Sequence, residues 1–214
     1  MKFPRRGLYA ITQTEHKSIS QILNEVELAL KSGVAVLQYR DKQPLDALNL
    51  AQQLSRLCQQ YSVPLIINDD VDLALKVGAD GVHLGRDDAS FDIARMRLGP
   101  EAIIGVSCYN DLKKAVLMAE RGADYVAFGR FYPSGTKPLA APADIATLTL
   151  ARQVLNIPIV AIGGIIPENA QLLVDAGADL IAVVGGIFND NPEKSVQNYF
   201  NSLNFDLDQI QPVQ

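Results

Sequence analysis

The stretch Gly177-Ala-Asp-Leu-Ile-Ala-Val-Val-Gly-Gly186 contains the unit that decides the fold of this chain. Its Gly-Ala-Asp opening leads into an apolar run, and the run ends in two glycines. Continuous apolar strands are typical of a parallel sheet that is buried on both faces. The opening recurs at Gly78-Ala-Asp80 and Gly122-Ala-Asp124, with a weaker copy at Gly33-Val34. Because glycine just past a helix end readily adopts positive φ, each copy indicates a helix that ends and a strand that begins.

The spacing of this repeat indicates how many strands and helices the chain contains. Its glycines, at positions 33, 78, 122 and 177, are 45, 44 and 55 residues apart, so each interval has room for two strand–helix units. Eight short apolar runs occur, at residues 7–11, 34–37, 64–67, 81–84, 103–106, 125–128, 158–162 and 180–184. Eight strands alternating with eight helices predict an α/β fold, a lean (β/α)8 TIM barrel. A doubly wound open sheet is the alternative, but only a closed barrel treats all strands alike.

The length fits a single barrel domain over residues 1–214, with 204–214 as a C-terminal tail. No Ser/Gly-rich linker or charge block divides the chain. Helical periodicity predicts the connecting helices at residues 19–31, 45–61, 71–77, 91–98, 111–121, 145–155 and 167–176.

Composition limits the partners of this protein. The chain carries 24 acidic and 19 basic residues, and a net charge of −5 without a basic stripe argues against nucleic acid. The longest apolar stretch, residues 157–166, is far shorter than the roughly 18 residues that cross a membrane. Two cysteines, Cys58 and Cys108, give no disulfide framework, and Cys58 is expected in a helix core. These features predict a cytoplasmic protein that binds neither nucleic acid nor membrane.

Two glycine pairs follow the last two apolar runs. In α/β folds the ligand lies beyond the carboxyl ends of the strands. Gly163-Gly164 and Gly185-Gly186 therefore occupy the place where many barrels bind phosphate. Backbone N–H groups approach an oxyanion most closely where no Cβ intervenes. The pairs predict a phosphate site, the alternative being two ordinary strand-to-helix turns.

Two carboxylates follow the third and fourth runs. Asp69 and Asp88 are expected on one rim of the barrel, because they end adjacent strands. Oxygen ligands at that spacing suit Mg²⁺, which binds one or two carboxylates and completes its shell with water and substrate phosphate. The alternative for any Asp after a strand is a helix N-cap, a role that suits Asp70 or Asp87.

Three cations are predicted on the same rim. Arg40 and Lys42 follow the second run, and Lys137 lies in the loop after the sixth. Cations, a divalent metal and backbone amides together describe a site for a heavily charged anion, most simply a diphosphate. The long loop 132–143 is a candidate lid. His83 lies inside a predicted strand and is expected to be structural.

The chain resembles the thiamin phosphate synthase family over nearly its whole length. The motifs that carry the resemblance are Gln38-Tyr-Arg-Asp-Lys42, Ile66-Ile-Asn-Asp-Asp-Val-Asp-Leu-Ala74, Gly78-Ala-Asp-Gly-Val-His-Leu-Gly-Arg-Asp-Asp88, Gly105-Val-Ser107, Pro133-Ser-Gly-Thr-Lys137, Ala161-Ile-Gly-Gly-Ile165 and Gly177-Ala-Asp-Leu-Ile-Ala-Val-Val184. Their order and spacing together are specific. The family joins 4-amino-5-hydroxymethyl-2-methylpyrimidine diphosphate to 4-methyl-5-(2-hydroxyethyl)thiazole phosphate, which releases pyrophosphate and forms thiamin phosphate.

The resemblance implies a role for each site residue. The implied contacts of the pyrimidine diphosphate are Gln38, Arg40, Lys42 and Asn68. The implied contacts of this substrate or its leaving pyrophosphate are Ser107 and Lys137, and the implied catalytic residues are Lys137, Ser107 and Arg40. The implied ligands of the cofactor Mg²⁺ are Asp69 and Asp88. The implied contacts of the thiazole phosphate are Ser134, Thr136, Gly164, Val184 and Gly185. The expected partners are thus small-molecule substrates, and a homo-oligomer is left open.

Three alternatives share the barrel. The sister family of thiazole tautomerases resembles the second half of the chain but typically has a His near Tyr109. A sugar-phosphate isomerase or epimerase would share the glycine pairs, and a non-catalytic ligand-sensing barrel would need no complete polar set. The residues that together favour the synthase are Tyr109, Asn68, Asp69, Asp88 and Lys137.

Overall fold

The computed structural model describes residues 1–44, 46–85, 89–133 and 141–203. Within them, eight strands form one closed barrel in chain order, and neighbouring strands are parallel. The strands are β1 (Gly7–Ile11), β2 (Val36–Tyr39), β3 (Leu65–Asn68), β4 (Gly81–Leu84), β5 (Ile103–Tyr109), β6 (Tyr125–Gly129), β7 (Ile159–Ile162) and β8 (Leu180–Val183). β1 pairs with β8 through Gly7 and Leu180, which closes the sheet. The predicted TIM barrel is confirmed, and the open-sheet alternative is wrong.

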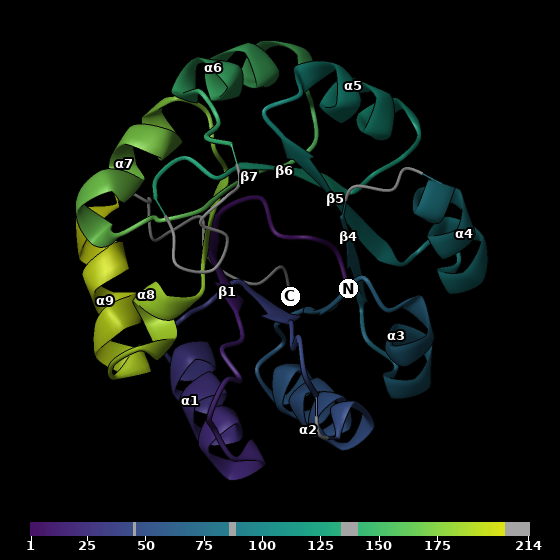
Figure 1. The fold of residues 1–214 in the computed structure, drawn as a ribbon, viewed down its shortest axis with the longest axis vertical. Coiled ribbons are helices and arrows are strands. Elements are labelled where there is room, and N and C mark those ends of the chain that lie inside the picture. The colour runs from purple at the N-terminus through teal and green to yellow at the C-terminus, as the bar shows by residue number, and fades with distance from the viewer. Residues whose placement is uncertain (45, 86–88, 134–140, 204–214) are drawn as a thin grey trace.

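A ring of helices surrounds the barrel (Figure 1). In the described residues they are α1 (Ile19–Lys31), α2 (Ala47–Gln60), α3 (Val71–Val77), α4 (Ala89–Leu98), α5 (Leu112–Glu120), α6 (Ile145–Val154), α7 (Pro167–Asp175), α8 (Gly185–Phe188) and α9 (Pro192–Ser202). The seven predicted helices are confirmed to within two residues at their ends. The expected total of eight is corrected, because both the short α8 and α9 follow β8. None of these helices is long and apolar enough to cross a membrane.

α9 completes the ring around the barrel. It packs against α1 on one side and α7 on the other, where Figure 1 shows it at the yellow end of the colour range. The four-residue α8 is therefore the extra element, and it lies directly after the last strand. A short extra helix at this point is a common part of phosphate sites in this fold.

Two strands extend by two or more residues beyond the apolar runs that predict them. The second run predicts a strand that ends before Gln38, whereas β2 includes Gln38. The fifth predicts a strand that ends before Ser107, whereas β5 continues past Ser107. Both polar side chains have hydrogen-bond partners inside the barrel, Tyr9 for Gln38 and His83 for Ser107. A polar residue whose hydrogen bonds are satisfied does not end a buried strand.

The repeat glycines have the conformation that their positions predict. φ is 98° at Gly33, 62° at Gly78, 88° at Gly122 and 118° at Gly177. Each follows an odd-numbered helix, α1, α3, α5 or α7, and precedes the next even-numbered strand. Residues with a Cβ rarely adopt these values, so glycine allows the chain to leave the helix and enter the sheet in one step.

The core fills both the space between strands and helices and the interior of the barrel. Inside the barrel, the Tyr125 ring lies over Gly105, where a Cβ would overlap the ring. Phe3 stacks on the same ring, with centroids 4.0 Å apart, and so fills the barrel at the amino ends of the strands. Cys58 is buried in α2 as predicted, and Cys108 is buried in β5.

Candidate active site

A cavity of about 730 Å³ opens at the carboxyl ends of the strands. Nine of the predicted site residues line it, namely Gln38, Arg40, Lys42, Asn68, Asp69, Ser107, Gly164, Val184 and Gly185. The other predicted site residues, Asp88, Ser134, Thr136 and Lys137, lie outside the described residues. The fold thus gathers into one cavity side chains and backbone from β2, β3, β5, β7 and β8 and the loops that follow them.

The basic end of β2 is held in place by Thr12, which follows β1. The buried Thr12 hydroxyl donates to the Arg40 carbonyl oxygen at 3.0 Å and accepts the Arg40 N–H at 2.9 Å. These two bonds fix the backbone where the chain turns from the strand toward Lys42. Arg40 is half-buried and Lys42 is exposed, so both cations stay hydrated while they face the cavity.

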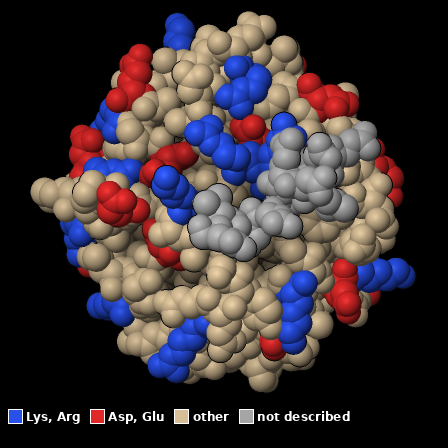
Figure 2. Space-filling view, turned by 180° about the vertical axis from the view of Figure 1, so that it is seen from behind, with Lys and Arg blue, Asp and Glu red and all other residues tan. Residues whose placement is uncertain are grey.

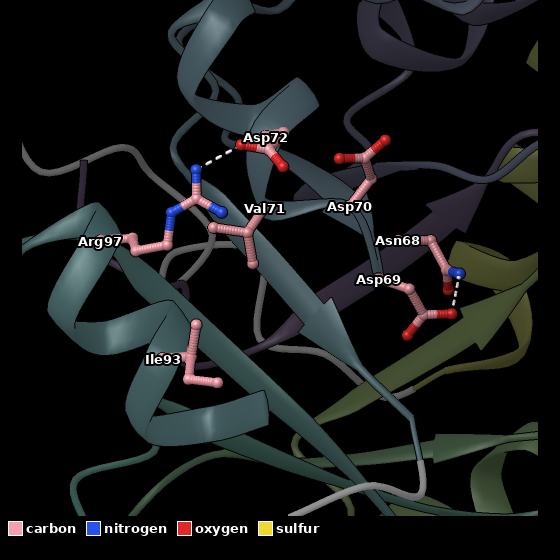
Figure 3. A pocket seen from close by; sticks show the side chains of 7 residues that line it. All are labelled: Asn68, Asp69, Asp70, Val71, Asp72, Ile93 and Arg97. Carbon is pink, nitrogen blue, oxygen red and sulfur yellow. Dashed lines mark hydrogen bonds and ion pairs between the residues drawn. The ribbon is translucent and has the colours of Figure 1, made fainter. Parts of the chain in front are cut away.

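The end of β3 presents an amide and a carboxylate side by side (Figure 3). The Asn68 amide nitrogen donates to Asp69 Oδ2 at 2.7 Å. Asp69 has a φ of 61°, and its N–H donates to the His83 carbonyl oxygen at 2.9 Å. Its other oxygen, Oδ1, lies toward Gly85, because a Cβ on Gly85 would be 3.5 Å from it. The Asp69 carboxylate is therefore held between the ends of β3 and β4, and the Asp69 backbone has a left-handed conformation that few residues other than glycine adopt.

The neighbouring Asp70 has the structural role that the sequence offers as an alternative. It is the N-cap of α3, and its carboxylate accepts an N–H of that helix at 2.8 Å. A second, more open hollow of about 470 Å³ lies beside Asp70 and extends to Arg97 in α4 (Figure 3). Arg97 is ion-paired with Asp72, so its charge is partly neutralised. The barrel cavity, which Arg40 lines, is the better site for an anion.

Beneath the cavity, five side chains from five strands form a chain of hydrogen bonds. Gln38 Nε2 donates to the Tyr9 hydroxyl at 2.8 Å, and the Tyr9 and Tyr125 hydroxyl oxygens are 2.8 Å apart. The Tyr125 hydroxyl lies 2.9 Å from His83 Nδ1, and His83 Nε2 lies 2.8 Å from Ser107 Oγ. Burial raises the pKa of both Tyr9 and Tyr125, because a phenolate loses its hydration inside the barrel. His83 is in a strand, as expected, and its ring is also part of the cavity wall.

The glycine pair after β7 supports the loop that follows β6. φ is 105° at Gly163 and 65° at Gly164. A Cβ on Gly164 would overlap the carbonyl oxygen of Pro133. The missing Cβ of Gly164 thus makes room for protein backbone, and the phosphate contact expected at Gly164 stays a prediction. Ile165 follows directly in the chain, and its carbonyl oxygen accepts the hydroxyl of Tyr199 from α9 at 2.8 Å. This bond fixes the same turn.

The pair after β8 begins a helix instead of forming a simple turn. Gly185 and Gly186 are the first residues of α8, and Val184 is its N-cap. The first N–H groups of a helix have no acceptor within the helix. A Cβ on Gly185 would meet the Asn189 side chain, 2.7 Å from Nδ2, whereas one on Gly186 would overlap the Tyr199 hydroxyl. Gly185 and Asn189 both line the cavity, so the start of α8 is part of its wall.

The cavity residues that are absent from the sequence predictions include Tyr9, Glu15 and Arg130. Arg130 directly follows β6, just as Arg40 directly follows β2, and this shared position was a usable signal. The sequence also held a signal for Tyr9, because its phenolic hydroxyl stands in an otherwise aliphatic run. Glu15 lies in the loop after β1, and nothing in its local sequence distinguishes it from other surface carboxylates.

Charges of both signs are interspersed over the face shown in Figure 2. Lys and Arg side chains gather near its middle, with acidic side chains among them, and further charged groups lie along the rim (Figure 2). A local group of cations within an acidic protein suits a small anionic ligand.

Comparison with known proteins points to one family. A model of the family described as thiamine monophosphate synthase matches residues 8–187. The thiamine-phosphate synthase of Nitrosococcus oceani is 54% identical over 185 residues, which are 86% of this chain and 85% of that protein. The thiamine-phosphate synthase of Methylobacillus flagellatus is 51% identical over 202 residues, 94% of this chain and 96% of that protein. The solved structure of thiamine phosphate pyrophosphorylase from Pyrococcus furiosus is similar with a TM-score of 0.83 at 29% identity, covering 97% of this chain and 98% of that one.

Proposed function

The chain belongs to the thiamine monophosphate synthase family, and we propose that its barrel cavity joins a pyrimidine diphosphate to a thiazole phosphate. The family makes the protein a transferase that forms thiamine phosphate. The observation that carries the site assignment is the division of the cavity. Cationic and amide groups at the ends of β2 and β3 form one wall, and the glycine turns after β7 and β8 form another.

The cationic wall is assigned to the pyrimidine diphosphate. Gln38, Arg40 and Asn68 lie on adjacent strand ends, and Lys42 follows them toward the mouth. Guanidinium and ammonium groups are the usual partners of phosphate oxygens. Because Thr12 holds the Arg40 backbone in place, the Arg40 side chain extends from a fixed point toward the diphosphate.

The opposite wall is assigned to the thiazole phosphate. Gly164, Val184 and Gly185 line the cavity there, and the start of α8 presents backbone N–H groups. Ser134 and Thr136 are assigned to the same phosphate from their positions in the sequence motif. The two substrates would then meet across the cavity, which has the volume for two small molecules.

Asp69 has the chemistry of a magnesium ligand. Its carboxylate lines the cavity, and Oδ1 lies toward the end of β4. Among the described residues, no group of three or more His, Cys, Asp or Glu side chains could hold a metal. The remaining ligands would come from Asp88, water and the diphosphate, which is the arrangement that Mg²⁺ favours. Bound there, Mg²⁺ would neutralise charge on the departing pyrophosphate.

The protein's own groups suit a reaction in which the leaving group departs first. The C–O bond between the pyrimidine methylene carbon and the diphosphate breaks, and the thiazole nitrogen captures the resulting cation. Arg40, Lys42 and Lys137 stabilise the negative charge that develops on pyrophosphate, and Ser107 adds a hydrogen bond. The loop 132–143 is assigned to keep water from the cation. A cytoplasmic location stays a prediction beside this one, and the oligomeric state is left open.

Incubation of the purified protein with both substrates and Mg²⁺ tests the function. The expected products, followed by mass spectrometry, are thiamine phosphate and pyrophosphate in equal amounts. Isomerisation of the thiazole phosphate alone would indicate a tautomerase. Binding of both substrates without any product would indicate a ligand-sensing barrel.

A further inference from the structure

The hydrogen-bond chain beneath the cavity has an order that its chemistry sets. An amide NH₂ group only donates, so Gln38 Nε2 must donate to the Tyr9 hydroxyl. The Tyr9 hydroxyl proton then needs an acceptor of its own, and the Tyr125 oxygen lies 2.8 Å away. A Tyr125 oxygen that accepts from Tyr9 leaves the Tyr125 proton for His83 Nδ1, which lies 2.9 Å away. An Nδ1 that accepts places the imidazole proton on Nε2, which faces Ser107 Oγ at 2.8 Å.

The last bond of the chain determines what Ser107 offers to a ligand. A serine hydroxyl has one proton and two lone pairs. If His83 Nε2–H occupies one lone pair, the serine proton is directed elsewhere, and the cavity that Ser107 lines is beside it. We propose that His83 is a positioning residue, held by Tyr125 as its Nε2–H tautomer so that the Ser107 hydroxyl is a hydrogen-bond donor toward the diphosphate substrate. The identity of that ligand rests on the proposed function, whereas the tautomer does not.

The packing of Tyr125 keeps the chain in one arrangement. Its ring fills the space over Gly105, where a Cβ would overlap it. Phe3 stacks beneath the ring at an interplanar angle of 8°, and the His83 ring lies at 23° to it with centroids 5.6 Å apart. Tyr9 contacts the same ring edge-on, with centroids 5.9 Å apart. These contacts with Gly105, Phe3, His83 and Tyr9 hold the Tyr125 ring in place, and with it the hydroxyl that fixes the tautomer of His83.

Nitrogen NMR reads the tautomer without any assay of activity. The chain has two histidines, so the variant His16→Gln, which removes an exposed ring, leaves His83 as the single labelled imidazole. At about pH 8, above the usual histidine pKa of about 6.5, long-range proton–nitrogen correlation should show a protonated Nε2 and an unprotonated Nδ1. Tyr125→Phe removes the donor to Nδ1 and should convert this pattern to a mixture of tautomers. An Nδ1–H tautomer in the parent, or an unchanged pattern in Tyr125→Phe, would overturn the proposal.

A matched control is available in β2. Tyr39 is a buried tyrosine whose hydroxyl has no hydrogen-bond partner among the described residues. Tyr39→Phe therefore makes the same chemical change as Tyr125→Phe outside the chain. It should leave the His83 spectrum unaltered, and a change of tautomer in this control would show that the spectrum reports general loosening of the barrel.

Kinetics distinguish positioning from a purely structural role. Tyr125→Phe should lower kcat about tenfold, the cost of one lost hydrogen bond, with the KM for the thiazole phosphate unchanged. The double variant Tyr125→Phe/Ser107→Ala should be no slower than Ser107→Ala alone, because both changes remove the same donor. Additive losses would overturn the proposal. If the parent makes no thiamine phosphate, the proposed function fails, while the tautomer experiment still decides the role of Tyr125.

Discussion

The carboxylate of Asp179 accepts the backbone N–H of Ile159 at 2.8 Å, and the Asp179 N–H donates to the Ile159 carbonyl oxygen at 2.8 Å. One residue before β8 thereby pairs with the first residue of β7 through both its backbone and its side chain. The same pair of bonds joins Asp80 to Leu65 and Asp124 to Ile104. The aspartate of the Gly-Ala-Asp repeat thus ties the start of one strand to the start of the strand before it.

Replacement of Asp179 should destabilise the barrel more when the new side chain has no acceptor oxygen than when it keeps one. Asp179→Ala leaves the buried Ile159 N–H without its acceptor, which costs about 1–3 kcal/mol of unfolding free energy. Asp179→Asn keeps an acceptor oxygen and loses the ion pair with Arg152, so its cost should be smaller. Urea denaturation measures both. Equal losses in the two variants would show that the ion pair, and not the bond to Ile159, stabilises this corner.

Four buried tyrosines should make the protein less stable in alkali. Burial raises the pKa values of Tyr9, Tyr39, Tyr125 and Tyr199. The folded protein then holds phenolic protons that the unfolded chain releases above about pH 10. Their contribution to stability is complete below that pH and is lost as the pH rises further. The phenolate absorbance of the native protein at about pH 11 should be smaller than that of the protein in urea, and the urea midpoint should fall between about pH 9 and about pH 11.

The same titration has a clear contrary outcome. If native and urea-unfolded protein develop equal phenolate absorbance at every pH, the barrel interior admits water to these hydroxyl groups. That result would contradict the proposed order of hydrogen bonds through Tyr9 and Tyr125.

Asp69→Asn should weaken the response to magnesium. The substitution keeps the side-chain shape but removes the charge of a proposed ligand, so turnover should fall about 10–100-fold and the Mg²⁺ concentration for half-maximal rate should rise. The control is Asp70→Asn, which retains the N-cap of α3 because asparagine caps helices as well as aspartate does. Chelation of divalent ions should abolish activity in the parent. Full activity in a chelator would refute the metal assignment for Asp69.

Alanine at Gly164 should affect stability, whereas alanine at Gly185 should affect substrate binding. Gly164→Ala forces a Cβ into the Pro133 carbonyl at a φ of 65°, and the left-handed conformation alone costs about 1–2 kcal/mol. The melting temperature should therefore drop. Gly185→Ala meets the movable end of the Asn189 side chain, so stability should change little. The proposed phosphate site at α8 predicts instead a higher KM for the thiazole phosphate.

The comparison of the two substrates checks the Gly185 variant. Its KM for the pyrimidine diphosphate should stay near that of the parent protein. If the KM for the pyrimidine diphosphate rises and the KM for the thiazole phosphate does not, the two substrates have been assigned to the wrong walls of the cavity.

The sequence by itself determined the barrel and the rim on which its polar residues gather. Each apolar run and each glycine of the repeat reports on a few neighbouring residues, since burial on both faces and positive φ are local requirements. For the same reason Arg40, Asn68 and Asp69 could be placed on one rim, because parallel strands end on one side of a sheet. The role of Asp70 as an N-cap was equally local, and the structure confirms it.

Only the tertiary structure decided which residues meet inside the barrel. Tyr9 and Tyr125 are 116 residues apart and belong to strands that are not neighbours, so no local pattern joins their hydroxyl groups. The reason for Gly164 also lies elsewhere, in the Pro133 carbonyl of a different loop. Closure of the sheet brings side chains from opposite strands within hydrogen-bond distance across the interior, and that distance depends on the packing of the whole barrel.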